Sequence, residues 1–205
     1  MVMEYYKFMK PNSKIYHQYI ANLPPLTPEL KEILIGLLLG DVAIQTQNKG
    51  KTFRLKFEWS DKYKAYAFHV YNLFKLYILK EPQLRIRINK NGNEVHTWWF
   101  NTVSTDIFLP IAKLFLNDEF KKIITKDLIF NHCEARSLAY WFMDDGGKLS
   151  YGKNKGKGIV LNTHSFTEKE VDNMIFNLRT KFNFNCWKKL NKGKYIIVIS
   201  GHSFD

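Results

Sequence analysis

The chain carries the same order of secondary-structure elements twice, and this internal repeat limits the folds that it can adopt. In the first half, a helix that runs up to Asp41 precedes two strand-like segments, a helix, two more strand-like segments and a last helix. After residue 133 the order starts again, with a helix that runs up to Asp145. Hairpins separated by helices indicate an α+β fold of two pseudo-symmetric αββαββα halves.

Local signals predict the first elements of this repeat. Thr27 is a helix N-cap followed by a proline, and the helical spacing of apolar residues continues to Gly40, so a helix should begin at residue 28 and end near Gly40. Segments 43–47 and 52–58 should be strands joined by a turn. The second strand alternates apolar residues with a polar face made of Arg54, Lys56 and Glu58.

A second hairpin is predicted by segments 84–89 and 95–100, which would turn at Asn91-Gly92. Its polar face carries Arg85, Arg87 and Asn89. Ser60 should cap a helix between the two hairpins. A helix over 105–116, with Pro110 as a kink, should close the first half.

The second half is predicted to contain a helix over 137–145, a strand over 158–165, a helix that opens at a capping box of Thr167 and Glu170, and strands over 185–190 and 194–200. We therefore expect two domains, residues 1–132 and residues 133–205. The second domain lacks a counterpart of the last helix of the first, so Ile197 and Ile199 are expected to be exposed.

Charge indicates the class of partner. The chain has 31 Lys and Arg against 19 Asp and Glu, a formal net charge of +12, which favours binding to a polyanion. The apolar run 33–39 is too short to span a bilayer, so no membrane association is expected. Two cysteines at unrelated positions argue against a disulfide scaffold. The excess of Lys, Asn, Ile, Phe and Tyr is typical of A+T-rich organellar genes, which suggests a mitochondrial origin.

Both repeated helices end in an aspartate, and pairing of these helices would create an acidic centre. Gly36 and Gly40 lie on one helix face, where the absence of side chains lets a second helix approach closely. Asp41 and Asp145 would then meet at the C-terminal helix ends, where dipoles and like charge disfavour ionisation. A divalent cation would compensate, and oxygen ligands suit Mg²⁺. The six histidines show no metal-ligand spacing that would compete.

Cationic strand faces beside such a metal suit phosphodiester hydrolysis, in which metal-bound water attacks and metal stabilises the leaving oxygen. Lys and Arg would bind phosphates, while Asn and Gln would contact bases. The candidate nucleic-acid-binding residues are Gln45, Gln47, Lys51, Arg54, Lys56, Arg85, Arg87, Asn89, Lys148, Lys153, Asn162, His164, Lys188 and Lys192.

The segment Ser137–Lys148, with the sequence SLAYWFMDDGGK, resembles the second motif of the LAGLIDADG homing endonucleases, and residues 34–41 resemble the first. Within that family the chain is similar to the monomeric omega-intron enzymes of mitochondrial large-rRNA introns. The resemblance implies a saddle of antiparallel sheets over DNA, with the motif helices at its centre. It also implies double-strand cleavage at a long asymmetric site by a monomer, with Mg²⁺ as cofactor and Mn²⁺ as a substitute. Asp41 and Asp145 would be the metal-binding acids.

The same resemblance assigns Lys122 as a catalytic residue that polarises the attacking water or offsets phosphate charge. The spacing from Asp41 to Lys122, counted again from Asp145, passes the last residue, so a second lysine of this kind is not expected. Two alternatives stay open. One is a maturase-like protein that binds group I intron RNA, and the other is a truncated descendant that binds DNA and nicks it or does not cut it.

Overall fold

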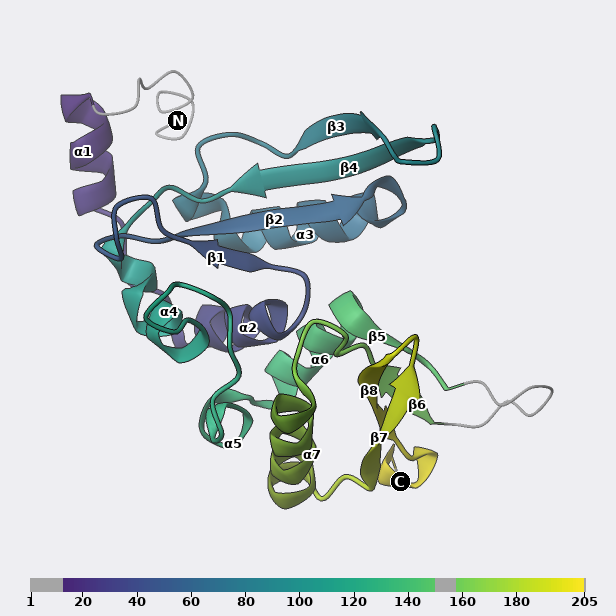
Figure 1. Ribbon diagram of the computed structural model, residues 1–205. Helices are drawn as coiled ribbons and strands as arrows, with labels where there is room; N and C mark the ends of the chain where they lie inside the picture. Colours follow the sequence, from purple (N-terminus) through teal and green to yellow (C-terminus); the bar gives the residue numbers. More distant parts are fainter. Residues whose placement is uncertain (1–12, 150–157, 205) are drawn as a thin grey trace. The chain divides into compact units, whose positions relative to one another are not determined.

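The computed structural model describes residues 13–149 and 158–204, and Figure 1 shows its elements. The helices are α1 (Lys14–Ala21), α2 (Pro28–Leu39), α3 (Lys64–Phe74), α4 (Leu109–Phe115), α5 (Leu128–His132), α6 (Ala135–Asp145) and α7 (Glu168–Phe182). The strands are β1 (Ala43–Gln45), β2 (Arg54–Ser60), β3 (Gln83–Ile88), β4 (Glu94–Asn101), β5 (Gly146–Lys148), β6 (Ile159–Leu161), β7 (Cys186–Asn191) and β8 (Lys194–Ile199). Short 3₁₀ helices occupy Asp61–Tyr63, Lys75–Tyr77, Asp106–Phe108 and Gly201–Phe204.

The strands form two antiparallel sheets with the same topology. The first sheet has the order β1-β2-β4-β3, and the second has the order β5-β6-β8-β7. Two antiparallel four-stranded sheets combined with helices confirm the predicted α+β class, and the matching strand orders confirm the topological repeat.

One face of the first sheet packs on α3, as Figure 1 shows. Phe57 is fully buried on this face. Its ring stacks on that of Phe100, with centroids 4.6 Å apart, and its centroid lies 5.7 Å from that of Phe74 in α3. Burial alternates along β2, with Leu55, Phe57 and Trp59 inside. The predicted period-2 strand is therefore confirmed, and its polar residues lie on the opposite face of the sheet.

The second sheet packs on α7, whose N-terminus has the predicted capping box of Thr167 and Glu170. The helix buries Met174 and Leu178 completely. The prediction that Ile197 and Ile199 are exposed is wrong: they are 0% and 2% exposed. Both face α7, because Ile199 pairs with Cys186, whose thiol contacts the Ile175 carbonyl oxygen of that helix.

Helices α2 and α6 meet through the predicted glycine face of α2. A Cβ atom on Gly36 would overlap the carbonyl oxygen of Ser137, and one on Gly40 would lie 2.5 Å from the Cβ of Asp144. Polar contacts support the other end of this helix pair, where Ser137 Oγ donates to the Glu32 carbonyl oxygen at 2.8 Å. The main chain of α2 therefore lies directly against the main chain of α6 at Gly36 and against the Asp144 side chain at Gly40.

By its contacts the chain divides into two compact units that differ from its sequence halves. Within the described residues, one unit contains 13–30 and 41–112, and the other contains 31–40, 113–149 and 158–204. Most of α2 thus belongs with the second sheet, because its glycine face packs on α6.

Some local elements differ from the sequence prediction. Helices α1 and α5 and the short strand β5 were not predicted, because each is short and lacks a clear apolar period. Pro110 does not kink a long helix; it lies in the first turn of α4, where its missing N–H is not needed. Ser60 precedes a 3₁₀ turn and makes no side-chain capping bond.

Candidate functional site

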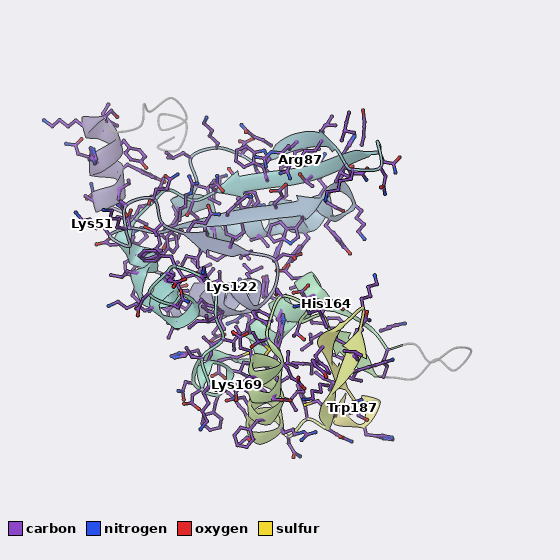
Figure 2. The ribbon with its side chains drawn as sticks, in the orientation of Figure 1. Lys51, Arg87, Lys122, His164, Lys169 and Trp187 are labelled. Carbon is purple, nitrogen blue, oxygen red and sulfur yellow. The ribbon has the colours of Figure 1, made fainter. Side chains whose placement is uncertain are left out.

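Lys122 reaches the end of α2. Its ammonium donates to the carbonyl oxygen of Gly40 at 3.1 Å and lies 5.7 Å from the ring centroid of Phe166 (Figure 2). The backbone N–H of Ile123 donates to the Phe115 carbonyl oxygen at 2.8 Å, which ties the segment that contains Lys122 to the end of α4. The carbonyls of a last helical turn carry partial negative charge, which a cation stabilises. The positive charge is therefore fixed one residue before Asp41.

The two aspartates follow the contact between α2 and α6. Gly40 lies against the side chain of Asp144, and along the chain Asp41 and Asp145 are the next residues. Asp41 is exposed, and Asp145 is half-buried. The carbonyl oxygen of Asp145 accepts hydrogen bonds from the backbone N–H and the side-chain amide of Asn162, both at 2.9 Å. Asn162 therefore holds the end of α6.

The face of the first sheet that points away from α3 is polar. Cross-strand partners share a face, so the register places its residues by pairs such as Gln45 with Arg54, Lys56 with Asn101 and Arg85 with Thr97. We call it the outer face of the first sheet. Besides Ala43, Ser60 and Val95, its residues are Gln45, Arg54, Lys56, Glu58, Gln83, Arg85, Arg87, Thr97, Trp99 and Asn101. The strand alternation predicted from sequence thus brings the candidate cations of two hairpins together.

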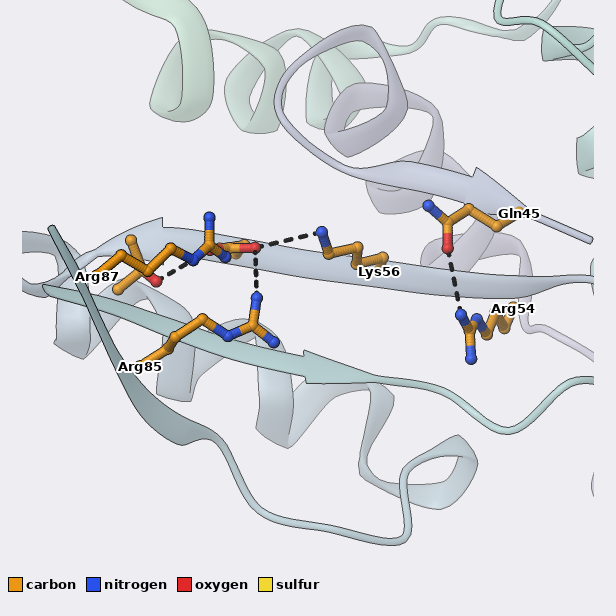
Figure 3. Close-up of polar contacts among 7 residues, drawn as sticks. Gln45, Arg54, Lys56, Arg85 and Arg87 are labelled. Carbon is orange, nitrogen blue, oxygen red and sulfur yellow. Dashed lines mark hydrogen bonds and ion pairs between the residues drawn. The ribbon is translucent and has the colours of Figure 1, made fainter. Parts of the chain in front are cut away.

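Polar contacts order this outer face (Figure 3). Arg54 Nη2 donates to Gln45 Oε1 at 3.5 Å. Arg85 lies over the ring of Trp99, 4.3 Å from its centroid, a cation–π arrangement that restrains the guanidinium. Glu58 bonds to neighbouring cations, and although burial alone would raise its pKa, hydrogen bonds and cations around the carboxylate keep the pKa below its ordinary value.

Three predicted nucleic-acid-binding residues lie in or next to turns. Gln47 and Lys51 are exposed and flank the turn between β1 and β2, with Lys51 labelled in Figure 2. Asn89 follows β3, and its side-chain oxygen accepts from the backbone N–H groups of Asn91 and Asn93 at 2.9 and 3.0 Å. The Asn89 carbonyl group therefore builds the hairpin turn and is already engaged.

The outer face of the second sheet, which points away from α7, has an apolar centre. The register assigns to it Gly147, Val160, Trp187, Lys189, Ile196 and Val198. Val198 and Ile196 are 0% and 3% exposed, and cations lie towards the β7–β8 hairpin, where Lys189 and Lys194 are exposed. Figure 2 labels Trp187 on this sheet.

Lys188 lies on the opposite face from Lys189. Its ammonium pairs with Glu168 at 2.6 Å and with Asp172 at 2.9 Å, both on α7, and the pKa of Lys188 is raised by these two carboxylates. The sequence prediction that Lys188 faces nucleic acid is corrected by this placement, because strand register turns Lys188 towards the helix. Lys189 takes the position that was expected of Lys188.

The remaining candidates occupy varied positions in the second unit. Lys148 is exposed but pairs with Ile159, so it is on the face of the sheet that α7 covers. Lys192 is exposed in the β7–β8 turn with a positive φ of 50°. The Nε2 atom of His164 is buried and has no hydrogen-bond partner among the described residues. Lys153 lies outside the described residues.

Sequence reasoning missed several contributors. Glu58 was not expected to bind three cations at once, and Trp99 was not expected to hold Arg85. The contacts of Glu58 could have been predicted in part from strand alternation, since Glu58 lies on the same face as the predicted cations of β2 and β3. The two cysteines are free and buried, as expected, and burial raises the pKa of Cys133 to about 12, which makes its thiol unreactive.

Known proteins resemble the chain along most of its length. Residues 31–205 match the LAGLIDADG DNA endonuclease family. A "Probable intron-encoded endonuclease 1" of Wickerhamomyces canadensis is 43% identical over 95% of this chain and 84% of that protein. The "Cytochrome b mRNA maturase bI2" of Debaryomyces hansenii is 32% identical over 78% of this chain and 59% of that protein. The structure titled "The homing endonuclease I-WcaI bound to its DNA recognition sequence" covers 97% of this chain and 88% of its own with a TM-score of 0.90 and 41% identity.

Proposed function

The chain belongs to the LAGLIDADG DNA endonuclease family, and from this premise we propose that it is an intron-encoded homing endonuclease whose Asp41, Asp145 and Lys122 hydrolyse both strands of a long asymmetric DNA site. The observation that supports these roles best is the bond of Lys122 to the Gly40 carbonyl oxygen, immediately before Asp41. The predicted family is thus confirmed, whereas the residue roles are our proposal.

The two aspartates suit a divalent metal that is shared with the substrate. Within residues 13–149 and 158–204, no group of three or more His, Cys, Asp or Glu side chains is arranged to hold a metal alone. Mg²⁺ is commonly held by one or two carboxylates together with substrate phosphates and water. In our proposal Asp41 and Asp145 would hold Mg²⁺ in this way, with Mn²⁺ as a substitute. When bound, the metal supplies charge stabilisation for the attacking and leaving oxygens.

Lys122 would act on the charge that develops during cleavage. Its ammonium is held by a backbone carbonyl, so it needs no reorganisation when a phosphate arrives. A preorganised cation that faces developing negative charge lowers the barrier more than a mobile one does. The neighbouring Lys121 pairs with Glu119 at 2.6 Å and is 74% exposed, so it is not held in this way.

DNA would lie against the outer face of the first sheet and against the exposed cations near the β7–β8 hairpin of the second. The outer face of the first sheet offers Arg54, Lys56, Arg85 and Arg87 for phosphates and guanine edges, and Gln45 for adenine edges. We propose that the protein acts as a monomer and, since the relatives are named as an intron-encoded endonuclease and a cytochrome b mRNA maturase, that it is encoded in the mitochondrion. No helix in the described part of the chain could cross a membrane.

Plasmid cleavage tests this function. Supercoiled plasmid that carries the I-WcaI recognition sequence, or a site selected by the chain from a randomised pool, is incubated with Mg²⁺ or with EDTA. We expect linear product with Mg²⁺ and none with EDTA. Asp145→Asn should abolish cleavage but retain binding of the same duplex in a mobility-shift assay. Cleavage that survives in Asp145→Asn would refute the role of this carboxylate.

A second candidate function is supported by the maturase relative. A maturase-like protein would use the same basic faces to bind group I intron RNA. Competition decides between the two, because an endonuclease should prefer its duplex DNA site over folded intron RNA of equal length, and a maturase should show the reverse order. Cleavage of the DNA site together with RNA preference would indicate both activities.

A further inference from the structure

Glu58 is an acidic residue in the middle of a surface that we propose binds DNA, a position where a negative charge opposes phosphate binding. Only 19% of its side chain is exposed. Of the two acidic residues in strands β1–β4, Glu58 lies on the outer face, whereas Glu94 pairs with Ile88 on the opposite face. The inference below rests on the proposed function.

The Glu58 carboxylate joins three strands, and Figure 3 labels Lys56, Arg85 and Arg87, the three cations that it contacts. It receives Arg87 Nη2 at 2.5 Å and Arg85 Nη1 at 3.5 Å from β3, and Lys56 Nζ at 3.3 Å from its own strand. Thr97 of β4 donates its hydroxyl to the same carboxylate at 2.9 Å. Hydrogen bonds to an ionised group are the stronger kind, so this cluster restrains the long cationic side chains.

Restrained and unrestrained arginines read DNA differently. A mobile guanidinium contacts any phosphate, so it adds affinity for every sequence and steepens the salt dependence. A guanidinium whose one edge is held by a carboxylate keeps other N–H groups in a fixed fork, which matches the O6 and N7 acceptors of guanine. Arg85 is restrained a second time by the ring of Trp99.

We propose that Glu58 is a positioning residue for sequence specificity, which orients Arg85 and Arg87 towards base edges and withholds their charge from general phosphate contact. The carboxylate itself does not contact DNA. Because the pKa of Glu58 is lowered, its side chain is charged at neutral pH.

The test compares Glu58→Gln with a variant of equal charge. Binding is measured to a duplex that the wild-type chain selects from a randomised pool and to a scrambled duplex of the same length and composition. For Glu58→Gln, we expect affinity for the scrambled duplex to rise roughly tenfold and the slope of log K against log salt to steepen by about one to three. The ratio of selected to scrambled affinity should fall about tenfold.

Glu94→Gln is the matched control. It raises the net charge by the same amount on the same sheet, but Glu94 faces away from the outer face and contacts His96 at 2.9 Å. We expect its affinity ratio and salt slope to equal those of the wild type. A Glu58→Gln variant that behaves like Glu94→Gln overturns the proposal. Loss of affinity for the selected duplex at an unchanged salt slope also overturns it, because the carboxylate would then contact a base itself.

Thr97→Val gives an independent result if Glu58→Gln does not fold. It retains every charge and removes the hydroxyl that donates to Glu58. We expect a smaller fall of the affinity ratio in the same direction, and an unchanged ratio contradicts the proposal. Failure of the proposed function is distinguishable, because a wild-type chain that does not prefer its selected duplex removes the premise itself, whatever the variants do.

Discussion

The two sheets share one strand order and differ in what their outer faces carry. On the first sheet, Lys56 pairs with Asn101, and charged side chains continue across β3. At the corresponding register of the second sheet, Val160 pairs with Val198, which is fully buried. The difference shows that a repeat of topology does not bring a repeat of chemistry, because the backbone pairing depends on alternation and not on which polar or apolar residue occupies a position.

The ends of the two motif helices differ in the same way. The last turn of α2 presents the Gly40 carbonyl to the Lys122 ammonium, whereas the Asp145 carbonyl at the end of α6 accepts neutral amide donors from Asn162. One end is thus stabilised by a full charge and the other by dipoles. If each end serves one DNA strand, the two cleavage steps need not be equally fast.

The largest expected effect on cleavage comes from removing the Lys122 ammonium at the end of α2. Lys122→Met should lower the rate of cleavage about 10²-fold, because a preorganised cation is lost where negative charge develops. Asn162→Ala should lower the rate of cleavage less than Lys122→Met does. Nicked circles should accumulate to different extents with these two variants. Time courses of supercoiled, nicked and linear plasmid measure both. Lys121→Met is the control, and equal loss in this variant would show a general effect of charge.

Exchanging one residue between the sheets tests the contrast of their outer faces. Val198→Asn should destabilise the fold by about 2–4 kcal/mol, because it buries a side-chain amide without a hydrogen-bond partner. The reverse change, Asn101→Val, should alter stability by less than about 1 kcal/mol, since Asn101 Oδ1 is already buried and has no hydrogen-bond partner among the described residues. Urea unfolding of both variants gives the comparison. Equal losses would contradict it.

Removing cations from each sheet shows how DNA affinity is distributed. The double variant Arg85→Ala/Arg87→Ala should weaken binding to the selected duplex roughly tenfold to a hundredfold, since base-edge contacts are lost. Lys189→Ala/Lys194→Ala should weaken selected and scrambled duplexes alike, as phosphate contacts do. Mobility shifts at two salt concentrations separate the cases. A sequence-selective effect of the second pair would reverse our assignment.

The smallest effect concerns pH. The pKa of Glu58 is lower in the folded protein than in the unfolded chain, so its contribution to stability is present above the unfolded pKa and is lost as pH falls through the folded pKa. The wild type should therefore lose up to about 1 kcal/mol more than Glu58→Gln between about pH 5 and pH 3. Thermal melts at the two pH values measure this. Identical pH dependence in the two proteins would exclude a stabilising role for the cluster.

Sequence patterns predicted the parts of the fold that depend on local chemistry. The Thr167 capping box, the alternation in β2 and the glycine face of α2 are all present as expected. The position of Lys122 followed from the family resemblance, and the bond to Gly40 agrees with it. These features involve one element, or two elements related by a motif.

The parts that failed depend on register and on neighbours distant in the sequence. Lys188 and Lys189 are adjacent, and only the pairing of β7 with β8 decides which of them meets the carboxylates of α7. Burial of Ile197 and Ile199 required α7 to cover the sheet without a further helix. The contacts of Glu58 join three strands, which no local pattern specifies.

The glycine face between α2 and α6 has a consequence for how this protein can change over time. Because Gly36 meets the main chain of Ser137 and Gly40 meets the side chain of Asp144, the two helices are held at a short separation that a side chain at either glycine would prevent. Side chains on the remaining surfaces can then diversify without displacing the helix ends. A scaffold anchored in this way retains its geometry while its two sheets acquire unlike DNA preferences, which is the freedom that an enzyme needs when it moves to a new target sequence.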